Sequence, residues 1–425
     1  MNAGVNAGRS TGRTNGTGRT DGTDGTDGTD GNVTGPLYVI SLAFGWLLFG
    51  SGPVIPRLQA DYDISRTVAS LHSVAFAAGG VVGALFTLAI MRRTRRGGAL
   101  VHGLAGMSLG AVAICAGPLV GGYGLALSIL GFGVAGAAAT LVSTGTTAIV
   151  DARHGAASGS VLSAIHGTGA IAGLLAPAAI GATIAIGLTW RVGLLVHVPL
   201  ALVGIVLILR SWHDPFLRDG PPPAVVAHPS NPRGRAEPMP LRFWAVLAVL
   251  MVGVSLEFAF TVWSGALLQE RTPLTTAGST AAVSGVLVGM ASGRLLLARL
   301  ARGMAPRAVL STSAGVVTVG WAVLWVATLP PVGSAELAIA GLVLSGLGIG
   351  AFFPIGLAWL VKQSLGRPEA ATARLNIGGG VASGVMPFAL GFLADRIGVH
   401  LAFLLVPGVI VVAVVVLAGL RERAD

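Results

Sequence analysis

Glu257 is the one acidic side chain that lies deep inside an apolar stretch of the sequence. It falls within residues 243–268, and its separation from Arg242 places it about 22 Å along a helix, in the outer half of a membrane. An ionisable group in hydrocarbon is costly unless it is paired or reached by water, so it is a functional candidate by default. We predict that Glu257 exchanges a proton or binds a cation. The alternative is a neutral acid that hydrogen-bonds between helices or pairs with an arginine.

Hydroxyl side chains form one-sided stripes on two apolar segments. In residues 122–148 four of them follow one another at helical spacing: Thr140, Ser143, Thr144 and Thr147. Thr261 and Ser264 follow Glu257 on the same face of its helix. Such stripes face either water or a partner helix. The spacing leaves two interpretations open: a cavity lined by these hydroxyls, or packing between helices.

Two further polar residues stand 210 positions apart, at equivalent points of two apolar segments. His166 lies near the middle of residues 157–186, and Asn376 lies within residues 371–393. Polar groups at matched positions of two repeats suit a binding site near a pseudo-symmetry axis, although helix packing also accounts for them. Three tryptophans could stack on a ligand or anchor the chain at the membrane interface: Trp46, Trp263 and Trp359.

Composition indicates a membrane protein that crosses the bilayer many times. Of the 425 residues 53% are hydrophobic and 10% are charged, whereas a soluble domain has about 25% charged residues. The net charge of +10 comes from arginines in short loops without interleaved aromatic residues, so we expect anionic lipid and not nucleic acid as the partner. The single cysteine, Cys115, excludes disulfides. The histidines form no metal-binding set and no phosphate-binding loop is present, so we expect no metal and no cofactor.

Twelve apolar segments are each long enough to cross a bilayer as a helix. They lie near 36–58, 67–91, 98–117, 122–148, 157–186, 192–210, 243–268, 276–300, 307–329, 336–361, 371–393 and 399–420. They predict an all-α integral membrane protein with two six-helix bundles, 36–210 and 243–420, joined by a proline-rich linker at 211–242. Residues 1–35 carry four TDG repeats and are predicted to be a disordered tail, and residues 421–425 form a short C-terminus.

The second bundle repeats the first at a fixed shift of 210 residues. Residues 166–181 and 376–391 then coincide at Gly169/Gly379, Ala172/Ala382, Pro177/Pro387, Ala179/Ala389 and Gly181/Gly391. The same shift maps Gly79 onto Gly289 and Gly83 onto Gly293. A fixed shift indicates a duplicated membrane unit, with chance agreement in a chain rich in Gly and Ala as the alternative. Helix packing and bending are predicted for Pro177, Pro387, Gly169, Gly173, Gly181, Gly379, Gly384 and Gly391.

Basic residues are distributed unequally between the two sides of this topology. One side, with both termini and the linker, holds 22 of the 27 Lys and Arg residues, and the other side holds five. The positive-inside rule therefore predicts cytoplasmic termini in an inner (plasma) membrane. Lysine occurs only at Lys362, a bias that suggests a GC-rich bacterial source.

These features together resemble the major facilitator superfamily. The loop Met91-Arg92-Arg93-Thr94-Arg95-Arg96 is similar to that family's Asp-Arg-x-Gly-Arg-Arg loop, with Met91 in place of the acid and Thr94 in place of the glycine. Trp190-Arg191 and the run from Gly391 through Asp395-Arg396 to Gly398 match loops that recur in the family. The resemblance implies a cytoplasmic gate formed by Arg92, Arg93, Arg95, Arg96, Arg294 and Arg302. It also implies a central cavity lined by the first, fourth, seventh and tenth helices.

The resemblance implies a secondary transporter in which two bundles rock around a substrate. Because buried charges are few, we expect a neutral or amphipathic small molecule. Proton-coupled efflux of a drug or metabolite is the first expectation, and sugar-like uptake by symport is the second. A sensor or lipid-handling protein that does not cycle is a further alternative. The sequence shows no paired acid and base in its apolar segments, so we do not expect an enzyme. Two complete bundles in one chain make a monomer sufficient.

Overall fold

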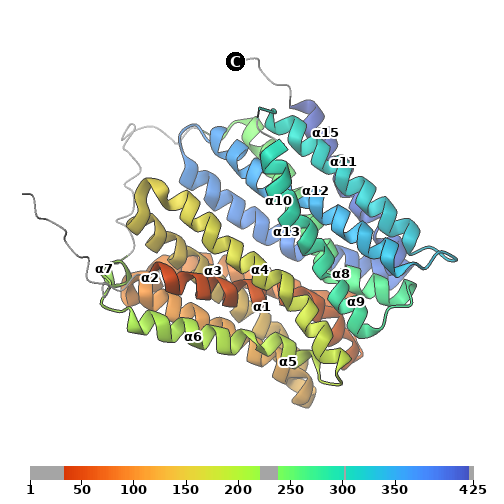
Figure 1. Cartoon of the computed structure of the whole chain (residues 1–425), viewed down its shortest axis with the longest axis horizontal. Coiled ribbons are helices and arrows are strands. Elements are labelled where there is room, and N and C mark those ends of the chain that lie inside the picture. The colour runs from red at the N-terminus through yellow and green to blue at the C-terminus, as the bar shows by residue number, and fades with distance from the viewer. Residues whose placement is uncertain (1–32, 221–237, 301–302, 421–425) are drawn as a thin grey trace, which may run out of the picture. The chain divides into compact units, whose positions relative to one another are not determined.

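The protein is described from a computed structural model, which places residues 33–220, 238–300 and 303–420 (Figure 1). The predicted tail up to residue 32, linker residues 221–237, Arg302 and residues 421–425 lie outside the described residues. Every regular element in the described ranges is a helix. The all-α prediction is confirmed.

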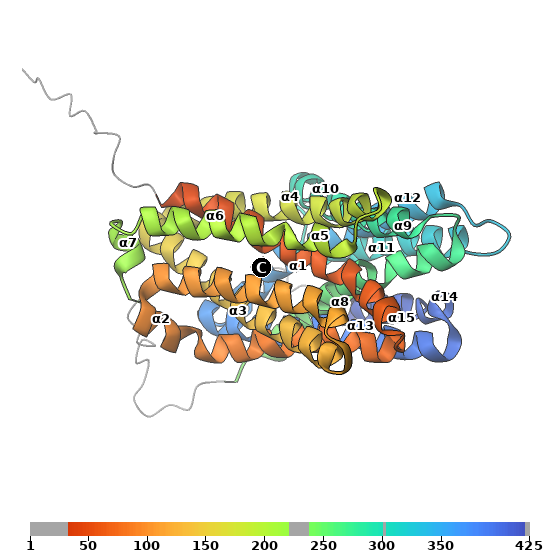
Figure 2. The same ribbon diagram turned by 90° about the horizontal axis from the view of Figure 1, so that it is seen from below.

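The helices form two sets that lie beside each other in both views (Figures 1 and 2). The first set consists of α1 (Thr34–Tyr62), α2 (Arg66–Ala116), α3 (Gly124–His154), α4 (Ser158–Ala185), α5 (Trp190–Leu195) and α6 (His197–Arg210). The second set consists of α8 (Leu241–Arg271), α9 (Thr276–Ala282), α10 (Ser284–Leu300), α11 (Pro306–Ala327), α12 (Ala335–Lys362), α13 (Pro368–Ile397), α14 (Val399–Ala402) and α15 (Leu405–Gly419). The short α7 (Pro215–Arg218) follows the first set.

In the described part of the chain, 11 helical segments are long and apolar enough to cross a membrane. The longest contains α2, which is broken at Arg95, where φ is 65° and ψ is 176°. Gly79 in the first part of α2 and Gly110 in the second part lie at the same level of α3, against Gly133 and Gly131. The chain therefore turns back at the break, and the two parts of α2 run in opposite directions along α3. The segment is therefore a helical hairpin with two spans, and the twelve predicted membrane helices are all present.

Close glycine contacts reproduce the 210-residue repeat in three dimensions. A side chain on Gly79 of α2 would collide with the carbonyl oxygen of Gly133 in α3. Adding 210 to both numbers gives the contact in the second set, where a side chain on Gly289 of α10 would collide with the carbonyl oxygen of Val343 in α12. Glycine is needed at such points because only a residue without Cβ lets two backbones approach so closely. The two sets are thus built on the same internal packing, as the sequence repeat predicted.

The two sets touch each other through α2 with α13 and through α4 with α9 and α10. At these contacts lie the glycines that end the repeated Pro-x-x-x-Gly motif. A side chain on Gly181 of α4 would meet Ala277 of α9, and one on Gly391 of α13 would meet Ser70 of α2. Gly384 faces Ala77 of α2. The motif therefore places small residues where the two sets pack against each other.

The other predicted packing glycines contact α1 or nothing. Gly169 faces the hydroxyl of Ser41, and Gly173 faces the ring of Phe49. Gly379 has no atom within 4 Å of the position where a side chain would begin, so it makes no close contact in this conformation.

The segment after α6 is fastened to the first set by an ion pair. One carboxylate oxygen of Asp214 accepts a hydrogen bond from the Phe216 amide at the start of α7 (2.9 Å), and the other accepts one from the Arg153 guanidinium (2.6 Å). Asp214 is buried and Arg153 lies over the Phe216 ring. The first residues of the linker are therefore held against the helix ends of α2 and α3.

We expect Asp214→Ala to destabilise this attachment by about 1–3 kcal/mol, because the variant loses two hydrogen bonds to a buried carboxylate. Limited proteolysis of the purified protein should then cut the linker faster. Asp219→Ala serves as the control, since that side chain is mostly exposed and lies 3.8 Å from Arg96. Equal cleavage rates for both variants would contradict the proposed role of Asp214.

Candidate functional site

A small cavity lies between the two sets of helices, and Glu257 of α8 is part of its wall. The other wall residues come from α1, α2, α3 and α8: Leu48, Phe49, Ser51, Gly52, Ile55, Ser73, Phe76, Phe132, Phe258, Thr261 and Val262. The space open to the centre of a water molecule is about 20 Å³, which is room for about one water molecule. The site therefore combines one carboxyl, three hydroxyls and four phenylalanine rings.

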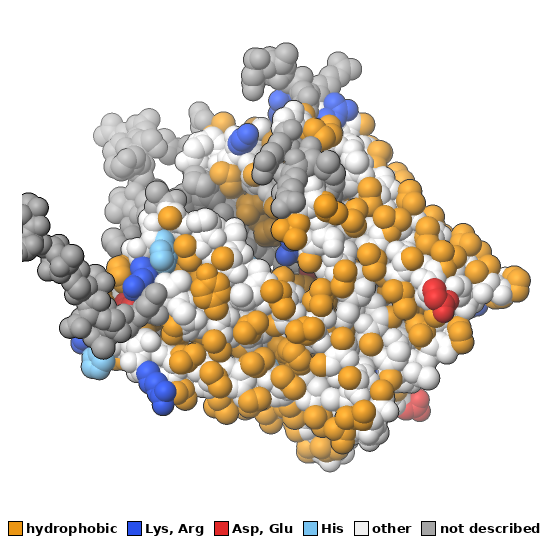
Figure 3. All heavy atoms as spheres, in the orientation of Figure 1, with side chains coloured by type: hydrophobic (Ala, Val, Ile, Leu, Met, Phe, Trp, Pro, Cys, Tyr) orange, Lys and Arg blue, Asp and Glu red, His pale blue; other side chains and the backbone are white. Residues whose placement is uncertain are grey.

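The Glu257 carboxyl forms no hydrogen bond or ion pair with any residue that the structure describes, although its main-chain carbonyl accepts a hydrogen bond from Thr261 (2.8 Å). The charge of Arg294 in α10 influences both Glu257 and His166 of α4. Arg294 and His166 are both exposed, and α4 and α10 lie in contact. The space-filling view shows this face hollowed, with basic side-chain atoms inside the hollow (Figure 3). Arg294 and His166 thus lie on two helices, one from each set, that are in contact with each other.

At one end of the molecule the two sets are joined by polar contacts; we call it the closed end. The Asp395 carboxylate of α13 accepts hydrogen bonds from the first two amides of α2, those of Arg66 (2.9 Å) and Thr67 (2.8 Å), and from the Thr67 hydroxyl (2.6 Å). Arg66 also pairs with Glu270 of α8. Ser65 accepts from the third amide, that of Val68. The start of α2 is therefore capped partly by its own set and partly by the other set.

The repeat has no such carboxylate at the matching contact between α4 and α9. The residue 210 positions before Asp395 is Ala185, the last residue of α4. At the opposite end, which we call the open end, Gly159 and Gly167 of α4 and Gly379 of α13 have no atom within 4 Å of where a side chain would begin. The two sets therefore meet at the closed end and separate towards the open end.

The sequence of the chain matches the profile of the Major Facilitator Superfamily over residues 37–302, which is more than half of its length. The chain belongs to the major facilitator superfamily. It is accordingly a multi-pass membrane protein and a secondary transporter of small molecules, and it is not an enzyme. No curated protein matches its sequence.

Solved structures of other superfamily members have the same fold. The xylose transporter XylE from E. coli, in a partially occluded inward open conformation, is 13% identical with a TM-score of 0.70, covering 92% of this chain and 98% of that one. A mutant of the nucleoside transporter NupG is 13% identical with a TM-score of 0.69, covering 92% and 100%. The transporter FucP in the outward conformation is 15% identical with a TM-score of 0.59, covering 92% and 99%. At these identities the likeness shows the fold alone.

The predicted hydroxyl stripes of the transporter have different surroundings. Thr261 lines the cavity beside Glu257, whereas Ser264 is fully buried and its hydroxyl has no hydrogen-bond partner among the described residues. In α3, Thr140 donates to the carbonyl of Gly80 in α2 (3.1 Å), and Thr147 donates to the carbonyl of Ser143 (3.0 Å). Thr144 is half-buried and Ser143 is exposed. Only Thr261 of these hydroxyls is part of the wall around Glu257.

Two of the three candidate tryptophans point into the protein. The indole N–H of Trp46 donates to the Gly193 carbonyl (2.9 Å), and that of Trp263 donates to the Pro387 carbonyl (3.0 Å). Both side chains are buried, so in this conformation they join helices and do not line the cavity. Trp359 is half-buried against apolar residues at the junction of two clusters, and Asn376 is exposed.

The predicted gate arginines divide into three groups. Arg92, Arg93 and Arg95 are exposed at the break in α2. Arg96 is buried, and its main-chain amide donates to the Asp219 carbonyl (3.2 Å). Arg294 of α10 is exposed, and Arg302 lies outside the described residues.

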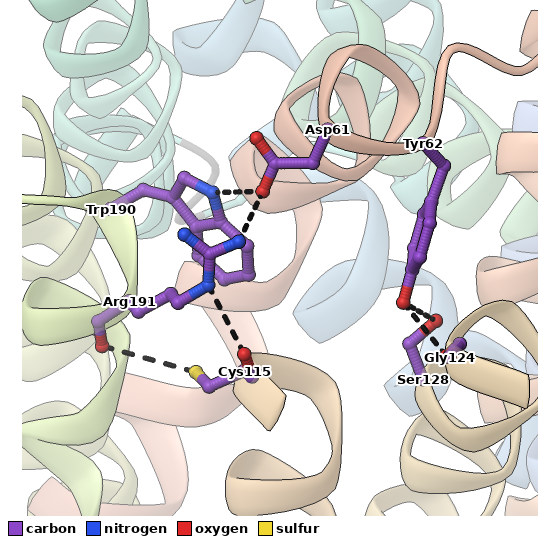
Figure 4. Close-up of polar contacts among 7 residues, drawn as sticks. All are labelled: Asp61, Tyr62, Cys115, Gly124, Ser128, Trp190 and Arg191. Carbon is purple, nitrogen blue, oxygen red and sulfur yellow. Dashed lines mark hydrogen bonds and ion pairs between the residues drawn. The ribbon is translucent and has the colours of Figure 1, made fainter. Parts of the chain in front are cut away.

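Polar residues that were not predicted stabilise the closed end of the first set (Figure 4). Asp61 at the end of α1 accepts hydrogen bonds from the Trp190 indole (3.0 Å) and the Arg191 guanidinium (2.7 Å). Arg191 also donates to the Cys115 carbonyl (3.1 Å). The matched Trp190-Arg191 loop therefore ties α1, α2 and α5 together.

The phenylalanines of the cavity were also not predicted, since apolar residues in an apolar helix carry no signal of their own. Behind them lies a buried histidine, His72 of α2, whose ring donates to or accepts from the Ser128 hydroxyl (2.9 Å) and packs edge-on against Phe132. Tyr62 donates to the same hydroxyl (3.1 Å). Neither His72 nor His166 forms a hydrogen bond or ion pair with Glu257.

Proposed function

We propose that the transporter moves a small amphipathic solute together with a proton, and that Glu257 carries the proton. The observation that supports this most directly is a carboxyl on the wall of a cavity between the two sets of helices that forms no hydrogen bond or ion pair with the described residues. A lone carboxyl in the membrane is unfavourable as a permanent charge, so a group that gains and loses a proton is the natural occupant of this position. The four phenylalanine rings around it suit the apolar part of an amphipathic solute.

We further propose that the closed end faces away from the cytoplasm, in the inner membrane of a bacterium, so that the structure is an inward-facing conformation. The excess of arginine at the open end supports this orientation. The chain also superposes better on XylE described as inward open (TM-score 0.70) than on FucP described as outward (TM-score 0.59). The cavity would then be reached from the cytoplasm.

The two functions expected from the sequence, efflux by proton antiport and uptake by proton symport, differ in the direction of coupling. Export by proton antiport requires solute and proton to exclude each other at Glu257. Uptake by symport requires them to bind together. The sign of the pH change that accompanies solute flux distinguishes the two.

Proton movement in liposomes tests the role of Glu257. Purified protein would be reconstituted with an internal pH dye and challenged with neutral sugars, organic amines, organic acids and hydrophobic drugs. We expect a solute-dependent pH change that Glu257→Gln abolishes, because the amide cannot release a proton. Glu336→Gln is the matched control, since Glu336 lies exposed in the first turn of α12 and hydrogen-bonds only with Ser334 among the described residues.

The outcomes discriminate among the functions. Solute flux that is equal in wild type and Glu257→Gln and moves no protons would refute coupling through Glu257. Acidification of the lumen with inward flux indicates symport, and alkalinisation indicates antiport. Absence of flux for the whole panel would favour the sensor or lipid-handling alternative.

A further inference from the structure

The polar groups in the wall of the Glu257 cavity are mainly hydrogen-bond acceptors. The Glu257 carboxyl is half-buried and forms no hydrogen bond or ion pair with the described residues. Ser51 donates its hydroxyl proton to the Leu48 carbonyl (2.9 Å). Thr261 donates its own to the main-chain carbonyl of Glu257 (2.8 Å). In this geometry the two hydroxyls offer a ligand only their oxygen lone pairs. Ser73 supplies a third hydroxyl.

Two prolines in α1 add main-chain acceptors to the same wall. Pro53 and Pro56 lie inside the helix, and proline has no N–H. The carbonyls four residues before them, those of Phe49 and Gly52, therefore lack their usual helical donor. Both residues line the cavity. The described wall thus offers acceptors from α1 and α8, and it includes no basic side chain.

Other charged or titratable side chains lie outside this wall. His72 of α2 lies behind Phe132, against which its ring packs. The charge of Arg294 in α10 influences Glu257. Arg57 of α1, which bonds to the side chain of α8 at position 269, and Asp395 of α13 belong to the closed end. None of these is part of the cavity wall, so Glu257 is the charged group that a ligand in the cavity would contact.

From this wall we propose that the cavity binds a primary ammonium group of the solute, with Glu257 as its counter-charge. A primary ammonium presents three N–H donors and no acceptor, which complements a wall of acceptors. Phenylalanine rings attract cations over their faces, and four of them belong to the wall. The open space of about 20 Å³ holds about one water molecule, so an ammonium head group fits there and a trimethylammonium head group does not.

This inference rests on the proposed function and selects one form of it. A protonated Glu257 in the empty cavity is neutral, and so is an ionised Glu257 paired with an ammonium. An ionised Glu257 alone, or a protonated one beside an ammonium, leaves a net charge that is costly in the membrane interior. The proton and the amine therefore replace each other at Glu257. That exclusion is the condition for antiport.

Calorimetric titration of the purified full-length protein at pH 7 tests the site without requiring transport. The probes are 2-phenylethylamine and hexylamine, each compared with its alcohol, 2-phenylethanol or hexan-1-ol, and with its trimethylammonium analogue. We expect at least one amine to bind about 10- to 100-fold more tightly than its alcohol, because a hydrogen bond to a charged group contributes about 1.5–3 kcal/mol. The trimethylammonium analogue, which has no N–H and a larger head, should bind more weakly than the amine.

Three variants locate the binding at this wall. Glu257→Gln should remove the preference for the amine over the alcohol. Thr261→Val keeps the shape of the side chain and removes one acceptor, so it should weaken amine binding about 2- to 10-fold. Glu336→Gln, in the exposed first turn of α12, should leave amine binding unchanged.

Proton release on amine binding, measured in weak buffer from about pH 5 to pH 8, separates this inference from the proposed function. Amine binding that releases protons in wild type, but not in Glu257→Gln, supports both. Amine binding that depends on Glu257 without proton release anywhere in this range leaves the ammonium site standing and refutes coupling through Glu257. Binding of no amine, equal binding of amine and alcohol, or an amine preference that Glu257→Gln retains overturns the ammonium site, whatever proton flux the liposomes show.

Discussion

Alanine at Gly79 and Gly289 together should destabilise the folded transporter by about 2–6 kcal/mol, because each added methyl group overpacks a helix contact at a cost of about 1–3 kcal/mol. At both positions the methyl group would overlap a carbonyl oxygen of the neighbouring helix, and a backbone cannot move aside as a flexible side chain can. The two sites lie in different sets, so their effects should add. Thermal unfolding in detergent and the recovery of monodisperse protein measure the effect.

Gly315→Ala is the matched control for this experiment. Gly315 also lies in a membrane helix, α11, but it is exposed and has no atom within 4 Å of the position where a side chain would begin. Alanine is the better helix former by about 1 kcal/mol, so this variant should be as stable as the wild type or more so. If the double variant behaves like Gly315→Ala, the close approach of α2 to α3 and of α10 to α12 is refuted.

Removing the Asp395 carboxylate should shift the transporter towards a conformation in which the two sets of helices separate at the closed end. Asp395→Ala leaves the first two amides of α2 without a protein acceptor when the two sets are together. When the sets separate, water can hydrate those amides in the wild type as in the variant. The variant therefore loses stability only in the closed arrangement. Loss of a helix cap costs about 0.5–2 kcal/mol, which corresponds to a change of about 2- to 30-fold in the ratio of the two conformations.

Distances between two spin labels at the closed end measure this ratio. Exposed positions at the ends of α1 and α13, Asp63→Cys and Ile397→Cys, would carry the labels in a Cys115→Ala background. Thr67→Val is the control, because it removes a single hydroxyl hydrogen bond and keeps both amide donors and the carboxylate. An unchanged distance distribution in Asp395→Ala would show that the cap does not hold the closed end.

The helices and the repeat could be predicted because both depend on local composition and spacing. A run of apolar residues has to be a helix in a bilayer, and glycines recur where helix backbones touch, as Gly79 and Gly289 do. The hairpin in α2 also followed from the sequence, since the arginines that interrupt its apolar run lie at the break at Arg95.

The direction of individual side chains could not be predicted in the same way. Trp46 and Trp263 lie in helices expected to line the cavity, but the angle of each helix about its own axis turns both rings towards neighbouring helices. Arg294 was assigned to the gate from the family resemblance, and its side chain is exposed. Helix rotation depends on contacts between segments far apart in the sequence, and a single sequence does not contain that information.

The cap formed by Asp395 exists in one half of the repeat only, since Ala185 occupies the matching position. The contact between α2 and α13 thus includes an exposed electrostatic part in addition to its small residues, while the contact between α4 and α9 is formed by Gly181 and alanines. Salt screens exposed charges over about 8 Å at physiological ionic strength, but it does not weaken apolar packing. The balance between the two conformations should therefore vary with the salinity of the medium that bathes the closed end. With the proposed orientation that medium lies outside the cytoplasm, so the resting state of the transporter would follow the environment of the cell.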